Sequence, residues 1–224
     1  MTDVLNVLIL SGHMTREHDN EFRSFRLHNQ WLTTLLEDTG RFRVRVVEDP
    51  RGLGAEVIDK YDAVIVEFEG RDGYFDKAIG FGPETDAALL KFVHDDGKGI
   101  VWLHGSAAQE DDWGYPEECN VMRGSRLTVA GGLRPRPWGE AQLDTVDPRH
   151  PITDGIGARW SVTGDDILTG VTIGHDIDTF RRIEFISMFP RGVEWAATGE
   201  VSLEGPDRRG ERRFLPWPYY NREG

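Results

Sequence analysis

The sequence lacks the features that mark secreted, membrane-spanning and nucleic-acid-binding proteins. Its only cysteine is Cys119, so no disulfide can form within the chain. No apolar run approaches the roughly 18 residues of a membrane-spanning helix, and no basic segment precedes the short apolar run 4–10. Lys and Arg number 26 against 39 Asp and Glu, and the net charge of −13 disfavours binding to phosphate backbones or anionic membranes. We therefore expect a soluble, cytoplasmic protein that binds neither nucleic acid nor membranes.

Four segments have the composition of β-strands. Three of them, at 4–10, 61–66 and 99–103, are rich in apolar residues, as strands buried on both faces of a parallel sheet are. The fourth, 41–46, alternates arginine with apolar residues, which is typical of a strand at an exposed sheet edge. An exposed second strand fits a flavodoxin-like order, in which the second strand lies outside the first.

Apolar residues at helical spacing lie between these strands. They predict helices over 22–36 and 83–93, which close near Gly40 and Gly97. Strands that alternate with helices imply right-handed crossovers and a parallel sheet. We therefore expect an α/β fold with three layers, a flavodoxin-like, mostly parallel sheet with helices on both faces.

The pattern weakens after residue 108. Short strands are expected at 127–130, 141–146, 171–173 and 193–196. From Glu200 onward Gly, Pro and Arg dominate, and a segment rich in aromatic residues follows at 214–220. We expect one domain over residues 1–199 and a C-terminal tail over residues 200–224. The tail's aromatic side chains would be unfavourable in water, so we expect them to pack on the domain or on a second subunit of a homo-oligomer.

Polar residues directly follow several predicted strands, and four of the seven histidines are among them. Ligands bind beyond the carboxyl ends of parallel strands, so these residues are the first candidates for a functional site. They are His13, His18 and Asp19 after the first strand, Glu67 and Glu69 after the third, His104 and Ser106 after the fourth, and His175 after a late strand. Imidazoles gathered there either bind a divalent metal or transfer protons as general acid and base. Any one of them alone is more often a polar loop residue or a hydrogen-bonded core group.

His104 differs from the other histidines in its setting. The segment 100–108 consists of an apolar strand, one polar residue and then small residues, as in a nucleophile elbow, which presents one side chain above the sheet. The usual occupant is Cys or Ser, and here it is His104, with Ser106 as an alternative nucleophile. Cys119 lies in an acidic loop, where negative charge disfavours the thiolate, so we expect it to be unreactive.

Several other polar and aromatic residues have simpler explanations. His150 lies in a turn-rich segment before Pro151, where we expect hydrogen-bonded scaffolding rather than a ligand. Asp165 and Asp166 form a pair of adjacent acids, which in a loop are usually just solvated. Trp113, in an acidic aromatic loop, either stacks on a sugar ring or closes an edge of the core.

Together these segments resemble the ThuA-like (trehalose-utilisation) family, whose fold is similar to that of the class I glutamine amidotransferases. The most specific segments are 99–105, which ends in His104-Gly105, and 150–155, which contains His-Pro-Ile. The weaker ones are 7–12 with His18-Asp19, 61–66, Asp165-Asp166 and 193–195. Amidotransferases carry Cys where this chain has His104, so the resemblance implies that glutamine is not hydrolysed. It implies instead a role in carbohydrate metabolism, related to keto-sugars or trehalose.

The chain departs from the family pattern in its last part. The family follows its late strand, here expected at 193–195, with a glycine-rich turn, another strand and a Gly-His pair. In this chain 196–201 follows, and no histidine comes after it. The resemblance therefore does not support His175 as a site residue, and it implies an altered sheet edge or pocket wall.

Three hypotheses about function follow. The first is an enzyme acting on a small carbohydrate by keto-sugar isomerisation or metal-assisted hydrolysis, with His104, Asp19 and Glu69 as catalytic residues. In it, a divalent metal, zinc first, binds His18, His104 and His175, and the substrate contacts His13, Ser106 and Trp113; no other cofactor is expected. The second is a non-catalytic binding or scaffold protein on the same fold. The third, an amidase using Ser106 or Cys119, is the weakest, because it also needs a base and an oxyanion hole.

Overall fold

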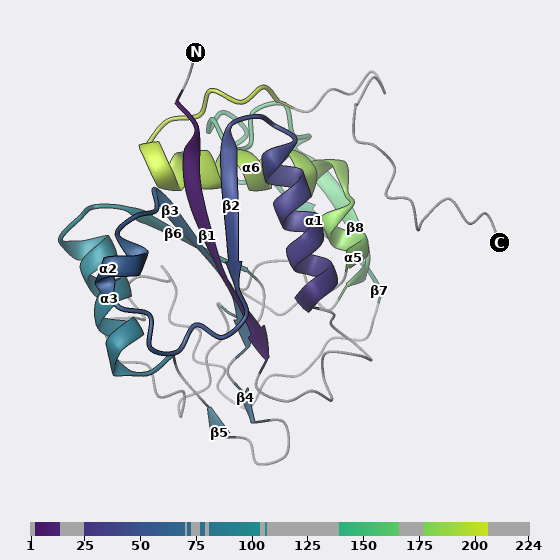
Figure 1. Cartoon of the computed structure of the whole chain (residues 1–224). Helices are drawn as coiled ribbons and strands as arrows, with labels where there is room; N and C mark the ends of the chain where they lie inside the picture. The colour runs from purple at the N-terminus through teal and green to yellow at the C-terminus, as the bar shows by residue number, and fades with distance from the viewer. Residues whose placement is uncertain are drawn as a thin grey trace.

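Four parallel strands form the central sheet, in the order β2–β1–β3–β6 (Figure 1). They are β1 (Leu5–His13), β2 (Phe42–Val47), β3 (Ala63–Glu69) and β6 (Gly99–Trp102). The computed structural model describes residues 3–13, 25–69, 71–72, 77–78, 81–103, 106, 139–165 and 177–205. The strand order confirms the predicted flavodoxin-like arrangement, with the arginine-rich strand β2 at one edge beside β1.

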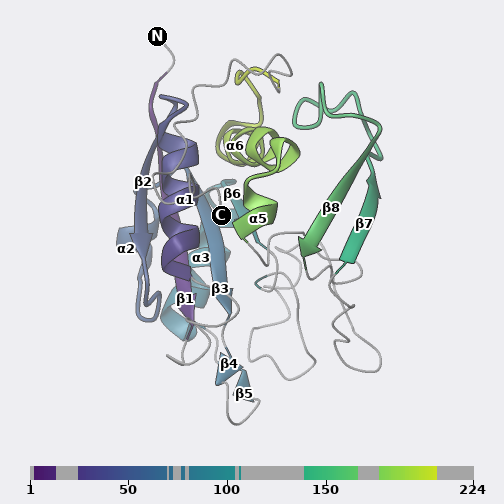
Figure 2. The same cartoon turned by 90° about the vertical axis from the view of Figure 1, so that its right-hand side faces the viewer.

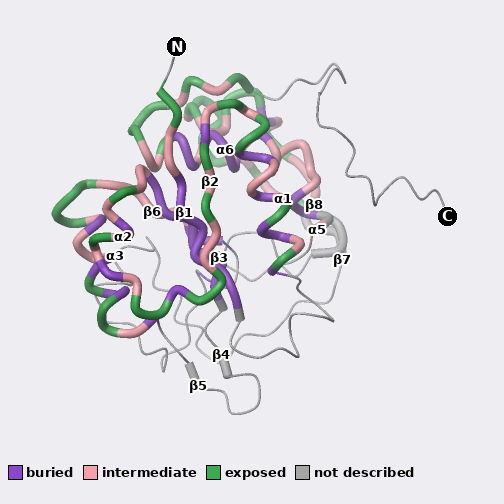
Figure 3. The backbone as a smooth tube through the Cα atoms, viewed as in Figure 1, coloured by how far each residue is buried: buried purple, intermediate pink, exposed green. Residues whose placement is uncertain are grey.

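Helices cover both faces of the sheet, which explains why the middle parts of its inner strands are apolar. Alternate residues of β1 point to opposite faces. Val7 and Ile9 belong to the core that α1 (Phe25–Glu37), α5 (Ile177–Phe180) and α6 (Ile183–Thr198) close. Leu8 and Leu10 belong to the core under α2 (Ala55–Ile58) and α3 (Pro83–His94). Figure 3 shows the resulting pattern, with buried strands inside and the exposed residues of the helices on the outside.

Two antiparallel pairs lie outside the central sheet. The larger is β7 (Gly139–Asp144) with β8 (Arg159–Asp165), and the smaller is β4 (Arg71–Asp72) with β5 (Lys77–Ala78). Figure 2 shows β7 and β8 on the far side of α5 and α6 from the central sheet. Among the described helices, none combines the length and the hydropathy needed to cross a membrane.

The last part of the described chain differs from the sequence prediction. The strand expected at 193–196 is wrong, because these residues lie in α6. Phe185, Phe189 and Val193 recur every fourth residue and are buried together, which is the spacing of one helix face. The helix also contains Pro190 and ends at Gly199, whose φ of 76° is left-handed. Strand β8 was not predicted, whereas β7 matches the strand expected at 141–146 apart from its ends.

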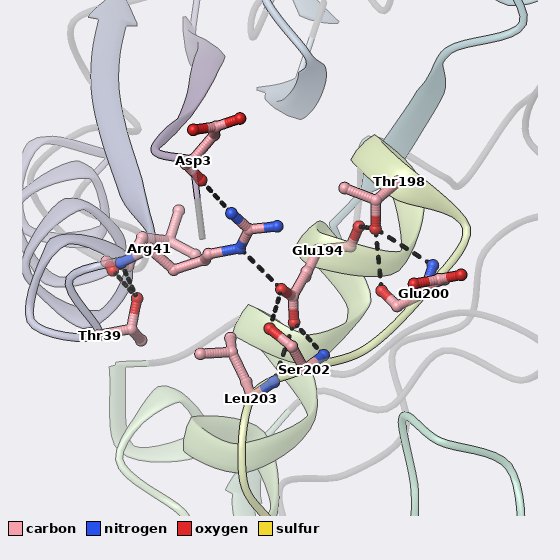
Figure 4. A network of polar contacts seen from close by, with 9 residues as sticks. Asp3, Thr39, Arg41, Glu194, Thr198, Glu200, Ser202 and Leu203 are labelled. Carbon is pink, nitrogen blue, oxygen red and sulfur yellow. Dashed lines mark hydrogen bonds and ion pairs between the residues drawn. The ribbon is translucent and has the colours of Figure 1, made fainter. Parts of the chain in front are cut away.

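Residues beyond α6 are held to the body of the domain by one carboxylate (Figure 4). Glu194 accepts hydrogen bonds from the backbone N–H groups of Ser202 and Leu203, at 2.8 and 3.0 Å, and from the Ser202 hydroxyl at 2.6 Å. It also accepts one from the Arg41 guanidinium, just before β2. Burial acts to raise the pKa of the Glu194 carboxyl, but these hydrogen bonds outweigh it, and the pKa lies below its ordinary value of 4.5. The first residues of the predicted tail therefore pack on the domain.

Candidate functional site

Polar residues replace apolar ones at the carboxyl ends of β1 and β3. The register of these strands pairs Ser11 with Glu67 and, one step nearer the end, His13 with Glu69. Both Ser11 and Glu67 are fully buried, in contrast to the usual exposure of such side chains. The carboxyl ends of the two central strands thus bring the backbone of a serine, a histidine and two glutamates together. Ligands of this fold class bind at these strand ends.

The Glu67 carboxylate has a buried partner in α1. The His28 Nδ1 lies 2.9 Å from the Glu67 Oε1, and the two side chains are 2% and 0% exposed. A carboxylate can only accept, so the proton between them belongs to Nδ1 when Glu67 is ionised, and the imidazole keeps its other nitrogen for a second interaction. The pair links the first turn of α1 to the end of β3.

Aromatic rings surround this pair on the helix side. The Phe180 ring stands edge-on to the His28 imidazole with 4.7 Å between centroids, and Phe185 stacks on Phe180 at 4.6 Å. An ion pair or a shared proton is held more strongly in such an apolar setting than in water, because the local dielectric constant is low. The rings therefore fix the orientation of the imidazole.

Two buried polar side chains, one in β1 and one in α1, have no hydrogen-bond partner among the described residues. Among the described residues, none hydrogen-bonds the Ser11 Oγ or either polar atom of the Asn29 carboxamide. Leaving such a group unsatisfied costs about 1–3 kcal/mol, so each is unfavourable for folding alone. Unpaired buried polar groups in a native protein often mark a place where function takes precedence over stability.

Ser106, predicted to contact substrate, is fully buried next to β3. Its Oγ accepts the backbone N–H of Phe68 at 2.9 Å, and its own backbone N–H donates to the Leu103 carbonyl at 3.0 Å. Ser106 thus connects the turn after β6 to the end of β3, at Phe68, which lies between Glu67 and Glu69 in the chain.

Gly12 permits the close approach of β1 to the residue after β2. Its φ is 125°, and a Cβ built there would lie 2.3 Å from the Glu48 carbonyl oxygen. No other residue fits without moving the backbone, because both the conformation and the space require glycine. The glycine that follows Ser11 therefore has a steric role at the carboxyl end of β1.

The other sequence-predicted site residues lie outside the described residues. They are His18, Asp19, His104, Trp113 and His175, along with Cys119 and Asp166. For His13 and Glu69 the structure describes the backbone, which the register places side by side. Within the described part of the chain, no group of three His, Cys, Asp or Glu residues could hold a metal ion.

Sequence reasoning missed His28, the partner of Glu67. It selected histidines that follow strands, whereas His28 lies in a helix. The available signal was its place in the apolar stripe of α1, between Phe25 and Leu32, opposite a strand with one internal carboxylate. The hydrogen bonding expected of His150 is present, since its Nδ1 accepts the Ile152 N–H at 3.2 Å and its ring packs edge-on against Trp195.

Comparison with known proteins agrees with this fold. Solved ThuA-like proteins are similar to it: one from Parabacteroides merdae has a TM-score of 0.59 and 18% identity, with 92% of this chain and 94% of that chain covered. Another from Bacteroides uniformis has a TM-score of 0.53 and 15% identity, with 73% of this chain and 60% of that chain covered. No curated protein matches the chain. A family model described as trehalose utilisation matches residues 6–171, most of the chain, which therefore belongs to the ThuA family.

Proposed function

We propose that this ThuA protein is an enzyme of carbohydrate metabolism that transfers protons on a small sugar at the carboxyl ends of β1 and β3. The observation that carries the proposal is the buried His28–Glu67 pair, with the Ser11 hydroxyl, which no described residue hydrogen-bonds, on the neighbouring strand. Buried acid–base groups where ligands bind to a fold are candidates for a functional site. The family description supports the sugar as substrate class.

The reaction we propose is the isomerisation of a keto-sugar. Glu69, beside His13 in the register, is the base that removes a proton from the carbon next to the sugar carbonyl. The proton is then added to the carbon that carried the carbonyl, so that the carbonyl and hydroxyl groups exchange places. The substrate is not oxidised overall, and no oxidant is needed. The His28–Glu67 pair is a positioning pair, because its side chains are too buried to touch the substrate.

The remaining predicted residues complete this proposal. His104 and Asp19 assist proton transfer, and Trp113 contacts the sugar. Ser106, which is fully buried, positions the end of β3 through the Phe68 N–H. His18, His104 and His175 hold a divalent metal, zinc first, which would polarise the sugar carbonyl as a Lewis acid. With a metal present, hydrolysis of a sugar derivative is the alternative reaction at the same site.

Hydrogen exchange in heavy water tests the proton-transfer proposal directly. The protein is incubated with aldoses, ketoses and keto-derivatives of trehalose, and deuterium at carbon is followed by NMR. We expect incorporation next to the carbonyl, and a loss of about a hundredfold in its rate in Glu69→Gln. The matched control is Glu84→Gln, on the exposed side of α3, which should behave as the wild type. Sugar binding without any exchange would favour the non-catalytic alternative.

Elemental analysis tests the metal. We expect about one zinc per chain after purification without an affinity tag, and its loss in His104→Ala. A metal-free protein whose sugar binding is unchanged in His104→Ala would overturn this part of the proposal.

A further inference from the structure

A second candidate site lies between α1 and the edge strand β2. It is a hollow of about 490 Å³, within the range of roughly 300–1,000 Å³ that small-molecule sites occupy. It is lined by Arg26, Asn29, Gln30, Thr33, Thr34, Val46 and Glu48. None of these residues belongs to β1 or β3, where the proposed reaction takes place. The hollow therefore adjoins the strand ends, since Glu48 lies against Gly12 of β1, but it is lined by other residues.

Helix geometry explains why these side chains meet. Residues three and four apart lie on one flank of a helix, so positions 26, 29, 30, 33 and 34 form a continuous wall along α1. Val46 and Glu48, at the end of β2, form the opposite wall. The helix wall carries two carboxamides and two hydroxyls, which can both donate and accept hydrogen bonds.

Among the lining residues, Asn29 gives the main evidence for a bound ligand. It is 5% exposed, and neither its amide nitrogen nor its amide oxygen has a hydrogen-bond partner among the described residues. Burying such a carboxamide is unfavourable unless something pairs with it. A small rotation toward the hollow that it lines would let a ligand provide both missing hydrogen bonds.

The charges at the hollow favour a neutral ligand. Arg26 and Glu48 approach to 3.8 Å from the two walls, and both side chains are mostly exposed, at 74% and 57%. Their charges compensate one another, and the remaining lining residues are uncharged. The net charge of the protein, −13, further disfavours a phosphate or a carboxylate. Neutral hydroxyl groups match this lining, because each can donate to a carboxamide oxygen and accept from its nitrogen.

We propose that the hollow between α1 and β2 binds a small neutral polyol or sugar through Asn29, Gln30 and the threonine hydroxyls. This goes beyond the proposed function, because it adds a binding site lined by residues outside β1 and β3. A ligand in the hollow contacts α1, the helix that carries His28. It would therefore bind on the opposite flank of the helical turn from the His28–Glu67 pair.

NMR titration of the ¹⁵N-labelled full chain with trehalose and with glucose tests the proposal. We expect shifts of backbone amides within 26–34 and 46–48, and weak, saturable binding. Asn29→Leu and Thr34→Val should each weaken the affinity by about tenfold, whereas Gln142→Leu, on exposed strand β7, should not. Asn29→Leu should leave the urea midpoint unchanged or raise it, because it removes an unpaired buried amide.

Three results would overturn the proposal: no shift at either segment, unchanged binding in Thr34→Val, or tighter binding of glucose 6-phosphate than of glucose. Should Asn29→Leu fail to fold, Thr34→Val still decides, since Thr34 is only partly buried. Glu69→Gln separates the two sites: it should lower the rate of hydrogen exchange about a hundredfold and leave the shifts at 26–34 intact. Loss of exchange activity alone therefore does not bear on the hollow.

Discussion

Arg41 and Glu194, 153 residues apart in the chain, form an ion pair with 2.8 Å between the Arg41 Nε and the Glu194 Oε1. The guanidinium also donates to the carbonyl of Asp3, before β1. The pair therefore connects the start of the sheet to the end of α6. Because the glutamate is only 1% exposed, it is shielded from the solvent that weakens most surface ion pairs.

Removing this carboxylate should destabilise the protein. We expect Glu194→Ala to lower the free energy of unfolding by about 3 kcal/mol, because it leaves the half-buried Arg41 guanidinium without its carboxylate and frees residues 202–203. Urea unfolding followed by circular dichroism measures the change. Glu200→Ala, six residues later with an exposed side chain, is the matched control and should change little. Equal effects of the two substitutions would contradict the structural role of the pair.

The stabilisation by Glu194 should depend on pH. Its pKa is lower in the folded protein than the ordinary 4.5, so the ionised form favours folding. This contribution is fully present above pH 4.5 and is lost as the pH falls through the lowered pKa of the folded state. The difference in unfolding free energy between wild type and Glu194→Gln should therefore shrink on acidification below pH 4.5. A difference that grows there would have the wrong sign.

The His28–Glu67 pair should be non-additive. Glu67→Leu alone removes the carboxylate that faces the buried imidazole, and His28→Leu alone removes the imidazole that faces the buried carboxylate. We expect each to cost about 3 kcal/mol, and the double variant to be less destabilised than their sum by about 1 kcal/mol or more. Unfolding of all four proteins in urea completes the cycle. Additive costs would show that the two side chains do not interact.

Gly12 should not tolerate a side chain. Gly12→Ala meets both an unfavourable φ of 125° and the Glu48 carbonyl oxygen, and we expect it to cost about 2–3 kcal/mol or more in unfolding free energy. Gly97→Ala is the control, since its φ of 65° is also positive but its Cβ meets nothing within 4 Å. It should cost about 1 kcal/mol. If the two variants were equally stable, the close contact at Gly12 would have no energetic consequence.

The N-terminal half of the fold could be predicted because its signals are strong and local. Strands covered by helices on both faces must be apolar throughout, as Ala63–Val66 is, and only β2 shows the alternation of an edge. The C-terminal part was harder. Helix α6 contains Pro190, which is unusual inside a helix and obscures the fourfold spacing of its buried face, and β8 has no run of apolar residues in its sequence.

Only the location of the candidate site could be predicted from the sequence. Register brings Glu67 and Glu69 beside Ser11 and His13, as the strand-end rule indicates. The partner of Glu67 depends on how α1 packs across the sheet, which is a tertiary contact 39 residues away and not a property of the local sequence. Roles that rest on His18, His104 and His175 stay predictions, as does the zinc ion.

The attachment of Ser202 and Leu203 to Glu194 determines where the protein can be shortened. A version ending at residue 200 would strip three donors from a carboxylate inside the domain, and any change in assembly would then be confounded by a weakened fold. Ending at Gly205 preserves this anchor, so the remaining segment can be removed and its own contribution measured cleanly.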